Sequence, residues 1–186
     1  MNKQTTSTIL IASILIIVAA MSRVLLYPHN FSPIIGMAIF AGASIKDKRL
    51  AFALPILAMF LSDVLFEVFN IAPGFWGWGQ LVSYSILALI TVIAFTLKKI
   101  SVLKIAGYSV GSSLLFFLLS NSAFFVIDNP IYHLYAQNFN GYIATLVAGI
   151  PFLKTSLVAD LVYSGVLFGA YYLIQNYIIS TKKVAA

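Results

Sequence analysis

The sequence predicts an all-α membrane protein with six transmembrane helices and both termini in the cytoplasm. Two observations support this fold class. Of the 186 residues, 61% are hydrophobic and 9% are charged, whereas a soluble domain carries about 25% charged residues. The basic residues stand in short clusters between long apolar runs, which is how charge sets topology in a bilayer. We expect one integral membrane domain over residues 1–186 and, since cysteine is absent, no disulfide and no thiolate metal site.

The apolar runs place the individual spans, because a crossing helix needs roughly 20 apolar residues. We expect the second helix to be short, because it opens directly after Pro33. The predicted spans cover about residues 7–26, 33–45, 50–70, 81–97, 105–127 and 151–179.

Six crossings segregate the charges between the two sides of the membrane. One side receives nine of the eleven basic residues and a single acid, Asp47, for a net charge of +8. The rest of the chain carries −2, from Arg23 and Lys154 against Asp63, Glu67, Asp128 and Asp160. The basic side is the cytoplasmic one by the positive-inside rule. This distribution also argues against nucleic acid as a partner.

An alternative interpretation concerns the first apolar run. Residues 1–20 also fit a secretory signal, with Lys3, an apolar core and a small-residue cleavage site at residues 18–20. Cleavage there would remove one crossing and place the basic loops outside.

The outer connections, residues 27–33, 72–80 and 128–142, are rich in aromatic and amide side chains, unlike the short basic inner ones. Aromatic belts at membrane interfaces explain part of this pattern. A belt on one side only is also typical of a lid over a small-molecule pocket, which usually has apolar walls and a few polar groups. The residues that we expect to contact a ligand in and beside these connections are His29, Asn30, Trp76, Trp78, Gln80, Tyr84 and His133.

Lys154 and Asp160 place two charges within the last apolar run. A charge at this depth costs about 2.5 kcal/mol or more unless it is paired or hydrated. At 3.6 residues per turn, residues six apart lie about 120° apart around the helix. Each side chain is therefore expected to pair with another helix or with a ligand.

Asp63 and Glu67 lie four residues apart, so they share one face of the third span. Two neighbouring carboxylates favour cation coordination, proton coupling or a clamp on a basic ligand group. Alternatively, they pair structurally with Arg23 or Lys154. Arg23 itself either reaches the headgroups or contacts a ligand anion. Asn121, in the fifth span, is expected to face the bundle interior and to bond a neighbouring helix or the ligand.

Several motifs are absent from the sequence. No phosphate-binding G-x4-G-K-[ST] stretch occurs, so uptake energy would come from an ion gradient or another subunit. The two histidines, His29 and His133, have no further His or Cys at ligand spacing, so we expect no metal site and no cofactor. No recognised catalytic motif is present, and we expect no enzymatic activity.

The chain resembles the S components of energy-coupling factor transporters, the membrane subunits that capture vitamins. The stretch that carries this resemblance is Pro151–Asp160, which opens in Pro-Phe-Leu-Lys. Ser22–Pro33 and Ser62-Asp63 are similar to a small uncharacterised bacterial group placed near that superfamily. The resemblance implies an S-component-like bundle in the bacterial cytoplasmic membrane, with a transmembrane coupling subunit and two ATPase subunits as partners. The chain departs from the pattern of spaced alanines on the first helix, since Ile16 follows Ala12 and leaves Ala19 and Ala20 as substitutes.

The leading hypothesis is a substrate-binding subunit for uptake of a small vitamin-like or heterocyclic metabolite, in contact with membrane lipid. An ion-coupled secondary carrier or channel is the alternative, with Asp63 and Glu67 as its coupling pair. A membrane enzyme using His29, Asp63 and Glu67, or a purely structural subunit, is a further alternative. The predicted ligand contacts are Arg23, His29, Asn30, Asp63, Glu67, Trp76, Trp78, Gln80, Tyr84, Asn121, His133, Lys154 and Asp160.

Overall fold

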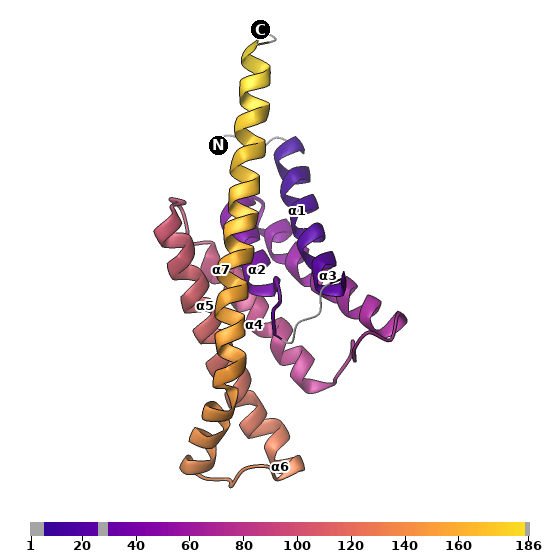
Figure 1. The fold of residues 1–186 in the computed structure, drawn as a ribbon, viewed down its shortest axis with the longest axis vertical. Helices are drawn as coiled ribbons and strands as arrows, with labels where there is room; N and C mark the ends of the chain where they lie inside the picture. Colours follow the sequence, from indigo (N-terminus) through magenta and orange to yellow (C-terminus); the bar gives the residue numbers. More distant parts are fainter. Residues whose placement is uncertain (1–5, 26–29, 185–186) are drawn as a thin grey trace.

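The computed structural model describes residues 6–25 and 30–184, with side chains to residue 177. Every regular element in this part of the chain is helical, which confirms the predicted all-α class. The first four predicted spans begin and end within three residues of the corresponding helices. The elements are α1 (Thr6–Leu25), α2 (Ile34–Ser44), α3 (Lys48–Val68), α4 (Trp78–Ala94), α5 (Val102–Ala123), η1 (Phe124–Asp128), α6 (Asn129–Tyr132) and α7 (Phe139–Val184), shown in Figure 1.

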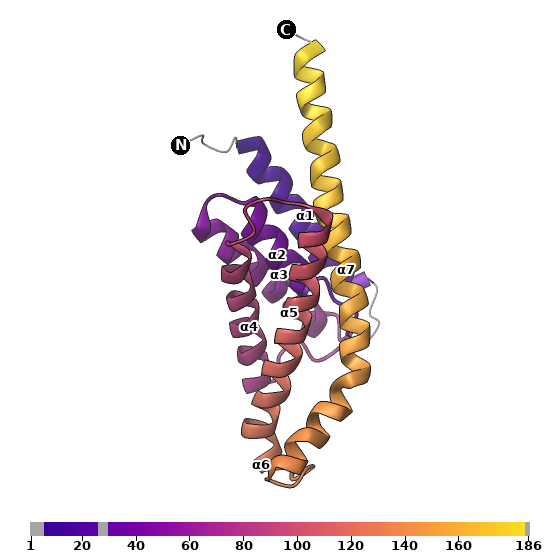
Figure 2. The same cartoon turned by 90° about the vertical axis from the view of Figure 1, so that its left-hand side faces the viewer.

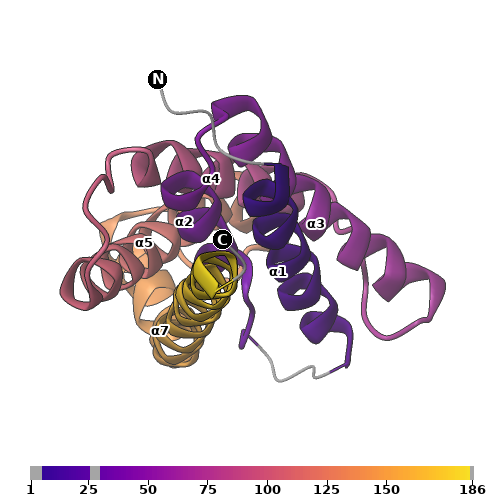
Figure 3. The same ribbon diagram turned by 90° about the horizontal axis from the view of Figure 1, so that it is seen from above.

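The short helix α2 forms the centre of the bundle, where it packs against α3, α4 and α7. Residues 35–42 are all buried, as expected for a helix that is apolar or small on every side. Phe40 meets the rings of Phe168 and Tyr171 on α7 edge-on, at centroid distances of 5.2 and 5.3 Å. Seen from above, α3 and α5 extend to opposite sides of α2 (Figure 3). The protein surrounds α2, so this helix has little contact with lipid.

Four helical stretches are long and apolar enough to cross a membrane: α1, α3, Val102–Tyr132 and Phe139–Tyr177. The apolar helices α2 and α4 are shorter, with 11 and 17 residues. At about 1.5 Å per residue α2 extends roughly 17 Å, about half the hydrocarbon core of a bilayer. These helices support a multi-pass membrane protein, while the count of six crossings stays a prediction.

Several segments lie towards one or the other end of the bundle. The start of α1, the α4–α5 connection and the end of α7 lie towards one end, and α6 lies at the other (Figures 1 and 2).

The predicted outer loop at residues 128–142 is wrong in extent. Helical structure continues from α5 through η1 and α6 to Tyr132, and α7 begins at Phe139. His133 ends α6 in the left-handed region, with φ of 52°. Asn138 begins α7 by accepting a hydrogen bond from the Gly141 N–H at 3.0 Å, which is an N-cap contact. Only residues 133–138 remain as a connection.

The predicted start of the last helix at Pro151 is also wrong, because this proline lies inside α7. Proline removes one backbone hydrogen bond and therefore often marks a helix boundary. A long apolar helix tolerates the loss because neighbouring groups satisfy the freed carbonyl. The 46 residues of α7 extend roughly 69 Å at 1.5 Å per residue. Its C-terminal part reaches beyond the other helices (Figure 1).

The small residues of α1 face the bundle. Ala12, Ala19 and Ala20 are all buried, while Leu10, Ile14 and Val18 are exposed. In the S components the spaced alanines dock the coupling subunit, whereas Ala19 and Ala20, their substitutes here, pack against the protein's own helices. The exposed face of α1 is instead lined by larger aliphatic side chains.

Candidate functional site

A cavity of about 520 Å³ lies between α1, α3, α4, α5, α7 and the chain that leads into α2. Trp76 and Tyr132 line it and are 59% and 65% exposed, whereas Asp63 and Asp160 line it and are each 2% exposed. The cavity therefore runs from exposed aromatic side chains to buried carboxyl groups. Its volume lies within the range of small-molecule sites.

A smaller cavity of about 290 Å³ adjoins the first one, between α5 and α7. Asn30, Ile35, Phe116, Ser120 and Ser156 line both cavities. The two spaces are therefore adjacent and share one wall.

Asn121 lines the smaller cavity, as expected for an amide that faces the bundle interior. Its Nδ2 donates to the Phe117 carbonyl of its own helix at 2.8 Å. Gly149 on α7 makes room for it, because a Cβ at that position would lie 2.8 Å from Asn121 Oδ1. The amide oxygen has no hydrogen-bond donor among the described residues, so it is free to accept one from a ligand.

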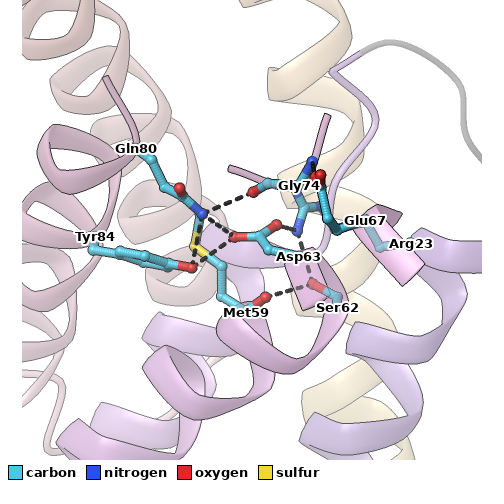
Figure 4. A network of polar contacts seen from close by, with 8 residues as sticks. All are labelled: Arg23, Met59, Ser62, Asp63, Glu67, Gly74, Gln80 and Tyr84. Atoms are coloured by element: carbon cyan, nitrogen blue, oxygen red, sulfur yellow. Dashed lines mark hydrogen bonds and ion pairs between the residues drawn. The ribbon is translucent and has the colours of Figure 1, made fainter. Parts of the chain in front are cut away.

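Asp63 is the centre of a polar network on one wall of the large cavity (Figure 4). Its Oδ1 accepts a hydrogen bond from Arg23. Its Oδ2 accepts from Gln80 Nε2 at 2.9 Å and from the Tyr84 hydroxyl at 2.7 Å. Three donors from α1 and α4 therefore hold one carboxylate of α3. The network ties these three helices together.

Arg23 is held by α3 through its Nη1 and the face of its guanidinium. Besides pairing with Asp63 it donates to Ser62 Oγ at 2.7 Å. Its guanidinium lies over the ring of Phe66, 4.5 Å from the centroid. The structure thus realises the structural pairing of Asp63 with Arg23 and leaves neither group free to couple an ion.

Glu67 is exposed and does not line either cavity. Its Oε2 accepts a hydrogen bond from the Gly74 N–H at 3.0 Å, and Gln80 Nε2 donates to the Gly74 carbonyl at 2.9 Å. Gly74 lies directly against α3, where a Cβ would meet the Asp63 carbonyl oxygen at 2.0 Å. Glu67 therefore fixes the loop that carries Trp76 over the cavity rather than forming a carboxylate pair with Asp63.

Asp160 lines the large cavity from α7 and is 2% exposed. Its Oδ2 accepts a hydrogen bond from Ser113 Oγ of α5 at 2.5 Å. One turn earlier on α5, Ser109 donates to Ser164 of α7 at 2.8 Å. These two serine contacts align α5 and α7 so that the carboxyl group of Asp160 reaches the cavity wall.

Some predicted ligand contacts lie away from both cavities. Trp78 begins α4 and is 69% exposed. Tyr84 and Gln80 belong to the Asp63 network rather than to the cavity wall. His133 is exposed at the end of α6, and His29 lies outside the described residues.

Lys154 also lies away from both cavities and is exposed. The reason is helical periodicity. Gly149, Leu153, Ser156 and Asp160 form the cavity face of α7. At about 100° per residue, Lys154 points away from this face.

Sequence reasoning missed most of the residues that α5 contributes. Ser113, Phe116, Phe117 and Ser120 follow the i, i+3, i+4, i+7 spacing of one helix face and line the smaller cavity together. That spacing is readable in the sequence. Asp128 also lines the large cavity and was identified only as an outer charge.

No group of three or more His, Cys, Asp or Glu side chains in the described ranges is arranged to hold a metal ion.

The sequence model of one protein family matches residues 3–182. The chain belongs to DUF6580, a family of unknown function. No curated protein and no solved structure matches it. The matched region contains every residue that lines the two cavities, so the site belongs to the part of the chain that defines the family.

Proposed function

We propose that this DUF6580 chain is a membrane-embedded substrate-binding subunit for uptake of a small aromatic or heterocyclic metabolite. The observation that carries the proposal is the cavity of about 520 Å³. Aromatic side chains at its rim offer flat apolar surface, and buried polar groups within it offer orientation. Small-molecule sites combine these two features.

The proposal includes six crossings in the bacterial cytoplasmic membrane, with both termini in the cytoplasm. Nine basic residues cluster at the termini and connections assigned to one side, which supports this orientation. The cavity then opens towards the outer side, since α6 and the 69–77 connection contribute its rim.

The energy source is proposed to be a partner complex, with a transmembrane coupling subunit and two ATPase subunits as in the energy-coupling factor transporters. Two features support a partner. The chain has no phosphate-binding loop of its own, and Asp63 is held by Arg23, Gln80 and Tyr84 rather than left free to couple an ion. Docking through the α1 alanines is not part of the proposal, because these residues are buried.

Native mass spectrometry of the protein, gently solubilised from its own host membrane, tests the proposal. We expect a bound metabolite in the wild type and its loss in Ser120→Phe, since Ser120 lines both cavities. The matched control is Ser85→Phe, because Ser85 is exposed on α4.

The same spectrum separates the two parts of the proposal. A metabolite together with ATPase subunits supports both parts, and a metabolite without them removes the partner complex. A bare chain, in a preparation that keeps other membrane complexes intact, contradicts ligand capture.

A further inference from the structure

Asp160 is a buried acidic side chain that faces the large cavity and has no charged partner among the described residues. We infer that the captured molecule carries a positively charged nitrogen and that Asp160 binds it. The assignment rests on the proposed function, because it specifies the chemistry of a ligand in the same cavity.

The protein satisfies the carboxyl group of Asp160 incompletely. Its Oδ2 has Ser113 Oγ at 2.5 Å, and Ser113 Oγ also lies 2.9 Å from the Ser109 carbonyl. A serine hydroxyl carries one proton, so the two acceptors share it. The other oxygen, Oδ1, has no hydrogen-bond donor in the described part of the chain. A buried carboxylate in this state is costly unless a donor or cation completes it.

No basic side chain in the described part of the chain is placed to neutralise Asp160. Among the described residues that line the two cavities, Arg23 is the base, and it is engaged by Asp63 and Ser62. Lys154, six residues earlier on α7, lies on another face of the helix and is exposed.

The fixed charges of the described residues that line the large cavity therefore sum to a negative value. One base, Arg23, stands against three acids, Asp63, Asp128 and Asp160, when the carboxyl groups are ionised. Asp63 cancels Arg23 by direct pairing. The remaining two carboxyl groups favour a cation over a neutral molecule and reject an anion.

The other side chains that line the cavity indicate which chemical groups the rest of the ligand carries. Phe116 and Phe124 line the wall contributed by α5 and η1, and Trp76 and Tyr132 line the exposed rim. Ser32 Oγ is buried in the cavity lining and has no hydrogen-bond partner among the described residues. A flat ring with one polar substituent, and a charged nitrogen directed at Asp160, satisfies all of these groups.

Three probes that share the same ring but differ in net charge test the assignment. Nicotinate is an anion, nicotinamide is neutral, and 1-methylnicotinamide is a permanent cation, so the charge of each is fixed at neutral pH. Binding to the purified full chain in lipid nanodiscs is measured by equilibrium dialysis. We expect the cation to bind at least about tenfold more tightly than the neutral probe, the usual effect of one charged contact in a desolvated site.

Asp160→Asn removes the charge at nearly constant shape and should abolish the preference for the cation. The matched control is Asp47→Asn, which removes one carboxylate at the exposed start of α3. Asparagine is an equally good N-cap, so this control keeps the helix intact and should keep the preference. Circular dichroism and unfolding of Asp160→Asn establish that the variant is folded before its binding is compared.

Each outcome decides one of the two hypotheses. Equal binding of the three probes by the wild type, or an unchanged preference in folded Asp160→Asn, overturns the role of Asp160 while cavity binding stands. If no probe binds, the chemistry of the metabolite retained from host membranes tests the role of Asp160. A retained metabolite with a cationic nitrogen supports this role, and one without a cationic nitrogen overturns it. If neither a probe nor a metabolite is retained, the proposed function fails as well.

Discussion

The ion pair of Arg23 and Asp63 joins α1 to α3 and should therefore stabilise the fold. Arg23→Met leaves a carboxylate that is 3% exposed without its cation, and Asp63→Asn leaves a guanidinium that is 13% exposed without its anion. Removing one partner of a buried ion pair costs about 3–5 kcal/mol. Asp63→Asn also replaces one of the two acceptor oxygens by an amide donor, which then faces a donor on either side, Arg23 or the pair Gln80 and Tyr84. We therefore expect each single change to lower the free energy of unfolding by about 3 kcal/mol or more.

The double variant Arg23→Met/Asp63→Asn separates the free energy of the ion pair from the other effects of the two substitutions on stability. It leaves neither charge buried alone, so its destabilisation should be smaller than the sum of the single changes by at least about 1.5 kcal/mol. Titration of the purified proteins with SDS in mixed micelles, followed by circular dichroism, gives the three free energies. The control Arg49→Met removes a basic side chain from an exposed position and should change the stability by no more than about 0.5 kcal/mol.

Two results would refute this reasoning. Single variants within about 1 kcal/mol of the wild type would show that water or lipid headgroups replace the pair at little cost. Effects that add to within about 0.5 kcal/mol would show that the two side chains act independently.

Three further predictions concern the loop, the rim and the last helix. Gly74→Ala should lower the temperature of unfolding, because the new Cβ would lie 2.0 Å from the Asp63 carbonyl oxygen. The control Gly79→Ala should leave that temperature unchanged, because a Cβ at residue 79 meets nothing within 4 Å. Trp76→Ala should weaken retention of the bound metabolite by up to about tenfold, as expected for loss of one aromatic contact, while Trp78→Ala, away from the cavity, should retain it. Lys154→Met should change retention by no more than about twofold, because an exposed residue away from the site contributes little.

Equal thermal stability of the two glycine variants would contradict the close packing of the loop on α3. Equal retention by the two tryptophan variants, measured by dialysis, would place the ligand away from the rim. Strong loss of retention in Lys154→Met would return this lysine to the site, as the sequence first indicated.

The sequence was a good guide to the helices because apolar length and charge clustering are local properties. The starts and ends of α1 to α4 follow the predicted spans closely. It was a poor guide to the 128–142 region, where polar and aromatic residues resemble a loop although most of them continue α5 or begin α7. Pro151 indicated a helix start, although a long apolar helix tolerates proline in its interior, and α7 instead begins after the N-cap Asn138.

The candidate site was predicted in part. Of the predicted ligand contacts, Arg23, Asn30, Asp63, Trp76 and Asp160 line the large cavity. The serines of α5 were not among the predicted ligand contacts, because a hydroxyl in an apolar helix is most often hydrogen-bonded to its own backbone. Their importance comes from the neighbouring helix, as Ser113 shows by its contact with Asp160.

The sequence alone determined the helical class, the approximate extent of the first four helices and the segregation of basic residues, since each depends on residues close together in the chain. Only the tertiary structure decided which charges pair. Arg23 is 40 positions from Asp63 and is held by it, whereas Glu67, one turn from Asp63, bonds the backbone of a loop. The same packing left Asp160 facing the cavity without a cation and turned Lys154 outward. A charge is compensated by whatever the fold brings within a few ångströms, and sequence spacing does not fix that distance between different helices.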